Sequence, residues 1–418
     1  MITVEEHLAR IVATVRRLPP VCLHLLDAQG SVLAQDVTSE VALPGFRNSA
    51  MDGYAVHAAD LLGASEAAPV TLPVEGDIAA GNTETLSLAL GRSIRIMTGA
   101  PMPDGADAVV PVELTDGGLA KVTVRAPMPV GQHVREAGED VASGDLLMRA
   151  GIRLEPRQIA LLAAVGIGAV TVTPKPRVVV ISTGDELIEP GTPPGFGQVV
   201  DSNSLMLTAA VRALDCSPLR VGCVRDDART FLSMIESQLL RADAVITTGG
   251  VSMGAYDTVK EVLSRIGTMR FDKVAMQPGM PQGFGVLGVD EVPVFTLPGN
   301  PVSAMVSFEV FVAPALRLMA GRPQLETSLV TAVASQDWTA PAGKVQYARV
   351  ILSRNGSGIS GHNGNPLYSV AIAGLQGSHA LGSLAGANAL AVIPANVTSV
   401  RVGDRVICHP LGPITEAP

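Results

Sequence analysis

Short polar loops that could carry chemistry follow several apolar, β-branched segments typical of buried strands. Acidic residues and paired glycines dominate these loops, which are STGDE at 182–186, RDD at 225–227, TTGGVSMG at 247–254 and LPGN at 297–300. Carboxylates can hold Mg²⁺ against a phosphate, and glycine turns that lead into a helix can offer backbone N–H groups to an oxyanion. The same segments can also be tight strand-to-helix turns without a ligand, and the pattern alone leaves both interpretations open.

The acidic loops would meet if their strands are parallel, because the carboxyl ends of parallel strands lie at one edge of an open α/β sheet. That edge would gather five carboxylates, Asp185, Glu186, Asp226, Asp227 and Asp257. A bound Mg²⁺ would offset their mutual repulsion. Taken singly, each acid could instead cap a helix or lie in its first turn.

The same loops contain the groups that could bind the oxyanion itself. These candidates are Thr248, Gly249, Gly250, Ser252, Gly254, Pro298, Gly299 and Asn300. Lys260 and Lys273 are the nearest cations in the sequence, although a lysine is more often a solvated surface charge. Asp52-Gly53 and Thr98-Gly99 have the composition of plain turns.

The elements that would position these loops form an α/β segment with β-rich segments on either side. Residues 4–15 have helical spacing, with Thr3 and Glu6 as a capping box. Strands are expected at 177–181, 219–224, 244–246 and 292–297. Helices are expected at 204–214, capped by Ser202 or Asn203; after Asp227, with Phe231, Ile235 and Leu239 on one face; and from Val302, where Pro314 must kink or end the helix. The predicted domains are 1–45 with 140–175 (discontinuous, with 4–15 packed against 140–175), 46–139 (β-rich), 176–322 (three-layer α/β) and 323–418 (β-barrel or sandwich).

Composition excludes several other functions. The 418 residues are 47% hydrophobic and 17% charged with a net charge of −9, so neither disorder nor a basic nucleic-acid-binding face is expected. The four cysteines form no CxxC pair, and there is no GxSxG motif, so zinc and nucleophilic acyl chemistry are disfavoured. No signal peptide is evident, and the apolar stretch 159–172 is too short to span a membrane. We therefore expect a cytoplasmic protein.

Eight segments extend this pattern along nearly the whole chain. They are PGFRNSAMDGYAV, RIMTGAPMPDGADAVVPVE, REAGED, STGDEL, TTGGVSMGAYD, MQPGMPQGFG, LPGNPVSA and QGSH. In sequence and order they resemble the MoeA-type molybdopterin molybdenumtransferases, the group that includes the gephyrin E domain, over residues 3–411. NSAMDGYA together with LPGNPVS is highly specific, whereas TTGG alone also occurs in adenylylating molybdopterin proteins and CinA-like proteins.

The resemblance implies four domains per subunit and an elongated homodimer. Its cleft would lie between the α/β domain of one subunit and the β-rich second domain of the other. The implied reaction inserts molybdate into adenylylated molybdopterin and releases AMP with Mg²⁺. The adenylyltransferase and molybdoenzyme chaperones are candidate partners, and neither nucleic acid nor a membrane is expected.

The resemblance also assigns site residues one by one. Asp52 in MDG and Thr98 in TGAP would come from the β-rich domain, which replaces their interpretation as plain turns. Around the metal and phosphate it places Glu186, Asp226 and Asp257. Facing the cleft, where they would hold molybdate, it places Lys273, Arg349 and Ser378.

The chain departs from the family pattern in the segment MQPGMP. Gln277 and Met280 stand where many members have lysines, so two charges expected to bind molybdate are missing. Lys273 or the backbone amide at Gly279 would then contribute more to molybdate binding. Two other functions stay open at this point: a scaffold that binds the cofactor without turnover, and the adenylylation step carried out by related α/β modules.

Overall fold

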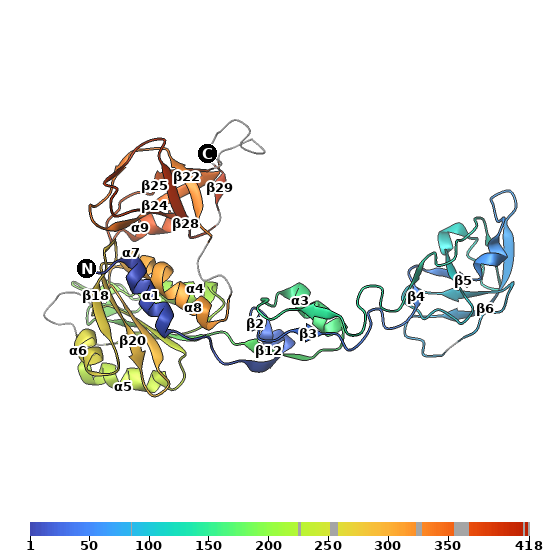
Figure 1. The fold of residues 1–418 in the computed structure, drawn as a ribbon, viewed down its shortest axis with the longest axis horizontal. Coiled ribbons are helices and arrows are strands. Elements are labelled where there is room, and N and C mark those ends of the chain that lie inside the picture. The colour runs from blue at the N-terminus through green and yellow to red at the C-terminus, as the bar shows by residue number, and fades with distance from the viewer. Residues whose placement is uncertain are drawn as a thin grey trace. The chain divides into compact units, whose positions relative to one another are not determined.

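The computed structural model describes residues 1–84, 86–224, 227–250, 258–322, 328–354, 368–412 and 414–416. The chain divides into two compact units (Figure 1). Unit 1 comprises Met1–Cys22, Gly30–Ala34 and Thr171–Pro418, and unit 2 comprises Leu23–Gln29 and Gln35–Val170. The boundary falls within strands β1 (Val21–His24) and β12 (Ala169–Thr173). In unit 1, β12 pairs with β2 (Val32–Leu33).

Unit 1 is built on a six-stranded sheet with the order β16-β13-β17-β21-β20-β18. Its strands are β13 (Arg177–Thr183), β16 (Ser217–Val224), β17 (Ala244–Thr248), β18 (Arg270–Lys273), β20 (Pro281–Leu287) and β21 (Val292–Leu297). The first four in the order pair in parallel, as expected, whereas β20 and β18 are antiparallel additions. Sequence reasoning missed these two strands because Gly283 and Gly285 interrupt the apolar pattern; a Cβ at Gly283 would collide with Thr296 Oγ1.

Helices cover both faces of this sheet. Val178 and Val180 of β13 pack with α4 (Asn203–Ala213) in one core cluster. Their neighbours Val179 and Ile181 point to the other face, where they pack with α5 (Ala228–Leu239) and α6 (Thr258–Arg265). This alternation buries both faces and confirms the predicted three-layer α/β architecture.

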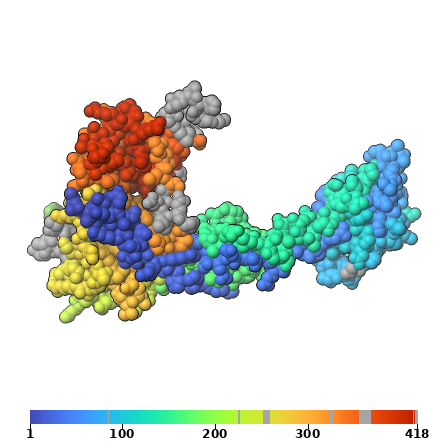
Figure 2. Space-filling model, in the orientation of Figure 1, coloured from blue at the N-terminus to red at the C-terminus, as the bar shows by residue number. Residues whose placement is uncertain are grey.

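The N-terminal helix α1 (Val4–Thr14) belongs to unit 1. Its capping box is present as predicted, with Thr3 Oγ1 accepting from the Glu6 amide and the Glu6 carboxylate accepting from the Thr3 amide. Val4 and Ile11 join the same core cluster as Phe308. The outer side of the N-terminal segment, blue in Figure 2, is visible at the surface of unit 1. The expected packing of this helix against 140–175 is therefore wrong, because its apolar face is buried within unit 1.

The long helix after the LPGN loop changes its hydrogen bonding midway. It consists of α7 (Pro301–Ser307), the π-helix η3 (Phe308–Val312) and α8 (Ala313–Met319). The wider turn directly precedes Pro314, which cannot donate a backbone hydrogen bond. The helix therefore does not end at Pro314 but continues to Met319, with the π-helical segment before the proline. By length and composition Pro301–Met319 could cross a membrane, with mean hydropathy 1.6, but 72% of it is buried in this fold, as in a core helix.

The C-terminal region forms a small barrel. Strands β22 (Val330–Ala334), β24 (Val345–Arg354), β25 (Tyr368–Ile372), β26 (Ala389–Ile393) and β28 (Arg405–Pro410) close into a ring through the β24–β26 pairing. Three short strands and a helix accompany it: β23 (Trp338–Thr339), β27 (Ser399–Val400), β29 (Thr415–Glu416) and α9 (Leu381–Ala385). β19 (Met276–Gln277) pairs with β24 and joins the barrel to the α/β part. A barrel, rather than a sandwich, is thus the outcome.

Unit 2 contains a five-stranded sheet in the order β8-β5-β7-β6-β9. These strands are β5 (Gly53–Val56), β6 (Val70–Ile78), β7 (Ser93–Ile96), β8 (Ala108–Pro111) and β9 (Lys121–Val124), with 3₁₀ turns at Ala58–Leu61 and Val112–Leu114. Two strand pairs and two contacting helices complete the unit: β4 (Asn48–Ser49) with β10 (Val134–Arg135), β3 (Val37–Thr38) with β11 (Leu146–Met148), and α2 (Leu25–Ala28) with α3 (Pro156–Ala164). The predicted β-rich region is confirmed.

Candidate functional site

Three loops converge at the carboxyl edge of the unit 1 sheet, as predicted from the parallel strands. They follow β13, β17 and β21, and they enclose a cavity of about 340 Å³ together with β14 (Leu187–Ile188), β15 (Val199–Val200) and the start of α4. The predicted residues that line it are Glu186, Thr248, Gly249, Gly299 and Asn300. Asp226, Ser252, Gly254 and Asp257 lie outside the described residues. A sheet edge with converging loops is where open α/β folds bind ligands.

The paired glycines after β17 are required by the turn itself. Gly249 and Gly250 have φ angles of +94° and +65°. A Cβ at Gly249 would collide with the backbone oxygen of Thr183, and one at Gly250 would lie 2.7 Å from Cγ2 of Val259. The Gly249 N–H donates to the Leu297 carbonyl at 3.2 Å. This amide therefore joins two loops, and the expectation that it is free to bind an oxyanion is wrong.

Asn203 connects the same two loops from the first turn of α4. Its Nδ2 donates to Thr248 Oγ1 at 3.0 Å and to the Gly299 carbonyl at 2.7 Å. Thr248 Oγ1 in turn donates to the Pro298 carbonyl at 3.1 Å. The Asn203 Oδ1 is buried with no hydrogen-bond partner in the described structure, so a donor group on a ligand in this cavity could satisfy it. Sequence reasoning treated Asn203 only as a possible helix cap.

A buried carboxylate below the cavity was not predicted at all. Asp201 is 1% exposed and accepts hydrogen bonds from Ser182 Oγ at 2.9 Å, from the Ser204 amide at 3.0 Å and from the Ser204 hydroxyl. Burial raises the pKa of Asp201, but the hydrogen bonds from Ser204 and Ser182 outweigh it and hold the pKa below its usual value. The signal in the sequence was an Asp three residues before Ser204 at the start of a helix.

Asp201 also belongs to a group with metal-ligand chemistry. Glu189, Asp201 and Cys223 offer ligand atoms within 4.8 Å of one another. Arg220 pairs with Glu189 at 2.7 Å and with Asp201 at 3.4 Å. Because one guanidinium pairs with both carboxylates and occupies the space between them, we interpret this cluster as an ion-pair network rather than a metal centre.

Glu186 is the predicted metal ligand that the structure describes. Its side chain is exposed at the cavity rim. A Cβ at Gly184 would lie 2.6 Å from Glu186 Oε2, so any larger residue at position 184 would displace this carboxylate. An exposed carboxylate oxygen fits a hard cation such as Mg²⁺. Asp227, by contrast, caps α5 by accepting a hydrogen bond from the Thr230 amide at 2.8 Å. This helix-capping role is the alternative to metal binding that the sequence left open for each acid.

The C-terminal barrel contributes one wall of the cavity through His379 and Leu381. Arg349 on β24 holds the loop before them, with Nη2 donating to the carbonyls of Leu375 at 2.7 Å and Gly377 at 3.2 Å. The Arg349 side chain is fully buried, and its Nε and Nη1 have no hydrogen-bond partner among the described residues. Burial lowers the pKa of this guanidinium.

The other two residues assigned to molybdate differ in position. The Ser378 carbonyl accepts from the Val302 amide at 3.2 Å, which ties the barrel loop to the start of α7. Lys273 ends the edge strand β18 and is exposed, and the described cavity lining does not include it. Gln277 is exposed on β19, and Met280 is half-buried.

Asp52 and Thr98 form a pair within unit 2. Asp52 Oδ1 accepts from both the amide and the hydroxyl of Thr98, each at 2.7 Å. The backbone N–H of Thr98, then its hydroxyl, lower the pKa of Asp52, which is solvent-exposed. In the sequence these two residues are connected only through the family resemblance, whereas the fold brings them together where β5 begins and β7 ends.

Three family models match successive parts of the chain. They are the MoeA N-terminal region (domain I and II) at residues 2–166, the probable molybdopterin binding domain at 179–318 and the MoeA C-terminal region (domain IV) at 331–411. Molybdopterin molybdenumtransferase 2 of Mycobacterium tuberculosis is 44% identical over 97% of this chain and 98% of its own. The Haemophilus influenzae molybdopterin molybdenumtransferase is 34% identical over 93% of each. The molybdopterin biosynthesis MoeA protein of Pyrococcus horikoshii superposes with a TM-score of 0.77 at 31% identity, covering 99% of this chain and 100% of that one.

Proposed function

Because this chain belongs to the MoeA family of molybdopterin molybdenumtransferases, we propose that it inserts molybdate into adenylylated molybdopterin and releases AMP. The observation that carries this proposal is the cavity of about 340 Å³, which Glu186, Thr248, Gly249, Gly299 and Asn300 line together. Its size lies within the range of small-molecule sites, about 300–1,000 Å³. A nucleotide phosphate and a pterin both carry polar groups, and their binding requires polar groups of the kind that line this cavity.

The residues of this cavity would bind and orient the substrate before any bond breaks. Asn203, Thr248 and the LPGN loop form a hydrogen-bonded frame that fixes the cavity wall. The unpartnered Asn203 Oδ1 would accept a hydrogen bond from an amino group of the substrate. Fixed polar groups of this kind lower the barrier by holding the reacting groups in place without reorganisation.

Glu186 would hold Mg²⁺ with Asp226 and Asp257, two acids outside the described residues. When bound, this cation neutralises charge on the substrate phosphate. The carboxylate of Glu186 lies at the cavity rim beside Gly184, where a phosphate entering from solvent would meet it. The other carboxylate at the cavity, Asp201, is already satisfied by Ser182, Ser204 and Arg220, so we assign it to the frame.

Molybdate would be held near the barrel loop. Arg349 is buried, and its Nε and Nη1 have no hydrogen-bond partner among the residues described. Buried charged groups with unmade hydrogen bonds are costly. An oxyanion beside Arg349 would remove that cost. Ser378 lies in the loop that Arg349 supports, and Lys273, which is exposed on β18, would approach from the sheet edge.

The Asp52–Thr98 pair of unit 2 would complete the site in a homodimer. Asp52 is an exposed acceptor whose lowered pKa keeps it ionised, a property suited to a catalytic carboxylate. We propose that this pair acts on the cavity of a second copy of the chain. The free cysteines, two of them buried, suit the reducing cytoplasm where we place the reaction.

The decisive assay mixes purified protein with adenylylated molybdopterin, Mg²⁺ and molybdate, and measures AMP and molybdenum-loaded cofactor. Glu186→Gln should lower the rate of AMP release at least about a hundredfold, whereas Glu236→Gln, at an exposed position of α5 away from the cavity, should leave it unchanged. Absence of both products with wild-type protein would favour a cofactor-binding scaffold. Consumption of Mg-ATP with unmodified molybdopterin would favour the adenylylation step.

Mixing two inactive variants tests the shared site. Asp52→Asn and Glu186→Gln subunits, refolded together, should regain about a quarter of the wild-type activity, because half of the random dimers contain one intact site of two. Each variant alone should stay inactive. No recovery on mixing, with mixed dimers demonstrated by differently tagged chains, would contradict a site shared between subunits.

A further inference from the structure

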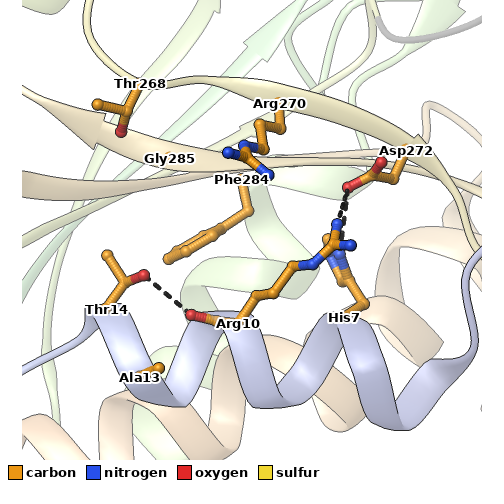
Figure 3. A pocket seen from close by; sticks show the side chains of 9 residues that line it. All are labelled: His7, Arg10, Ala13, Thr14, Thr268, Arg270, Asp272, Phe284 and Gly285. Atoms are coloured by element: carbon orange, nitrogen blue, oxygen red, sulfur yellow. Dashed lines mark hydrogen bonds and ion pairs between the residues drawn. The ribbon is translucent and has the colours of Figure 1, made fainter.

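A second cavity, of about 360 Å³, lies between helix α1 and the antiparallel strands β18 and β20 (Figure 3). None of its lining residues lines the cavity at the loop edge, and the transferase reaction proposed above has no use for them. It falls at the lower end of the range for small-molecule sites, about 300–1,000 Å³. A metabolite of modest size would fit this volume.

Periodicity in both elements aims polar side chains into this cavity. His7, Arg10 and Thr14 are three to seven residues apart on α1 and share one helix face. Arg270 and Asp272 are two residues apart on β18 and therefore point to the same side of the sheet. Figure 3 shows both guanidinium groups reaching toward the same space from opposite elements.

The charges in this cavity do not balance. Arg10 pairs with Asp272 at 3.2 Å, whereas Arg270 is exposed and has no ion pair or side-chain hydrogen bond with the described residues. Burial lowers the pKa of His7 to about 4, so the ring is neutral at pH 7. Two guanidinium groups thus face one carboxylate, and one positive charge is left for a ligand.

Two hydrogen-bonding groups are also available. The His7 side chain is 4% exposed, and its Nδ1 has no hydrogen-bond partner in the described part of the chain, since Asp272 Oδ2 is 4.0 Å away. The Thr268 hydroxyl accepts from the Val286 amide at 3.2 Å and keeps its own hydrogen to donate. A buried polar atom left without a partner indicates a group that a ligand or water would satisfy.

The remaining lining residues are apolar or have no polar side chain. Phe284 presents its ring to the cavity and is held by a tilted contact with Phe295 at 5.1 Å between ring centres. Ala13 and Gly285 add no polar side-chain group. A ligand that matches these walls therefore combines one negative charge with a compact apolar body.

We propose that this cavity binds a small organic oxyanion, a carboxylate or a phosphate monoester, with its charge on Arg270 and its apolar body against Phe284. Such a ligand would bridge α1 and β18 and so stabilise the docking of the N-terminal helix. This inference is independent of the transferase reaction, because it uses none of the same residues.

Saturation-transfer NMR titrations of the full chain with benzoate, phenyl phosphate and uncharged benzyl alcohol test the proposal. Both anions should bind more tightly than the alcohol. Comparing the affinities of benzoate and phenyl phosphate shows whether the cavity prefers a carboxylate or a phosphate monoester. Arg270→Gln should weaken both anions about tenfold, the size of a charge-assisted hydrogen bond, and leave the alcohol unchanged. Arg265→Gln is the matched control, since Arg265 is exposed and, among the described residues, pairs with Glu261 alone.

A second variant and a localisation measurement keep the test decisive. Ala13→Trp fills the cavity from an exposed position without disturbing the core, and it should abolish binding of all three probes. Hydrogen exchange should show protection by benzoate at residues 7–14 and 268–273. Protection at 247–250 and 298–303 instead would assign the probes to the loop-edge cavity. Three results would overturn the proposal. They are protection at the loop-edge cavity, equal affinity of the anions for wild type and Arg270→Gln, and the absence of saturation transfer from every probe.

Discussion

His7 should make the stability of unit 1 fall as the pH drops from about 6.5 to about 4. Its ring is 3% exposed and packs edge-on against Phe311 at 4.7 Å. Burial lowers the pKa of His7 from 6.5 to about 4, against the opposing charge of Asp272. Between these values the unfolded chain binds a proton that the folded chain does not. The stability is therefore complete above pH 6.5 and is lost as the pH falls toward 4.

The magnitude follows from the two pKa values of His7. A tenfold change in proton affinity is about 1.4 kcal/mol, so the fall from 6.5 to about 4 corresponds to about 3 kcal/mol of unfolding free energy at pH 4. The side chain is almost wholly buried, so solvent does not screen this effect appreciably. A loss of this size is a large part of the stability of a typical domain, about 5–15 kcal/mol.

Urea unfolding followed by Trp338 fluorescence measures this effect. Trp338 is the single tryptophan and lies on β23 in unit 1, and Ile11 and Leu390 share one core cluster, so helix α1 and the barrel should unfold together. His7→Phe keeps a ring against Phe311 and removes the unpartnered Nδ1. Wild type should lose about 3 kcal/mol more than this variant between pH 7.5 and pH 4. Parallel pH profiles for the two proteins would refute the reasoning.

Three further outcomes are expected. Asp52→Asn should lower AMP release by about a hundredfold or more, while Asp116→Asn, whose carboxylate has a similarly lowered pKa through Thr123, should leave the rate unchanged; equal losses would contradict a specific role. Gly249→Ala should cost roughly 2–4 kcal/mol by urea unfolding, because of its backbone strain and its clash with Thr183, whereas Gly191→Ala, with a similar φ of +96° and open space, should cost only the backbone strain of about 1–2 kcal/mol. Asp201→Asn should destabilise unit 1 by on the order of 3 kcal/mol and remove the part of the stability lost on acidification below pH 3.8; a neutral effect would exclude the proposed frame.

The elements that sequence reasoning predicted are those governed by local periodicity. The helical spacing and capping box of residues 3–14 gave α1 nearly to the residue, and the β-branched runs gave all four parallel strands. Placing Glu186, Thr248 and Gly299 together needed only one further rule, that parallel strands end at a common edge. Local pattern plus topology was enough for these residues.

The missed elements depend on contacts between distant segments. β20 contains Gly283 and Gly285, which have low strand propensity and are selected by close packing against β18 and β21. Helix α1 has an apolar face that could cover any partner, and only the three-dimensional core shows that Phe308 and its neighbours are that partner. Periodicity identifies a face to be buried and gives no information on what buries it.

The polar network beneath the cavity illustrates the same limit at the level of single atoms. Ser182 and Arg220 each lie 19 residues from Asp201, and whether their side chains meet depends on strand register and rotamers that no local pattern records. The exposed acids at strand ends could be located from the sequence because the parallel topology alone places them at the carboxyl edge of the sheet. A buried acid is located only by its donors, and here those donors come from β13, α4 and β16 at once. The residues that shape a site from below are therefore less predictable than the residues that face its ligand, although the fold depends on them at least as strongly.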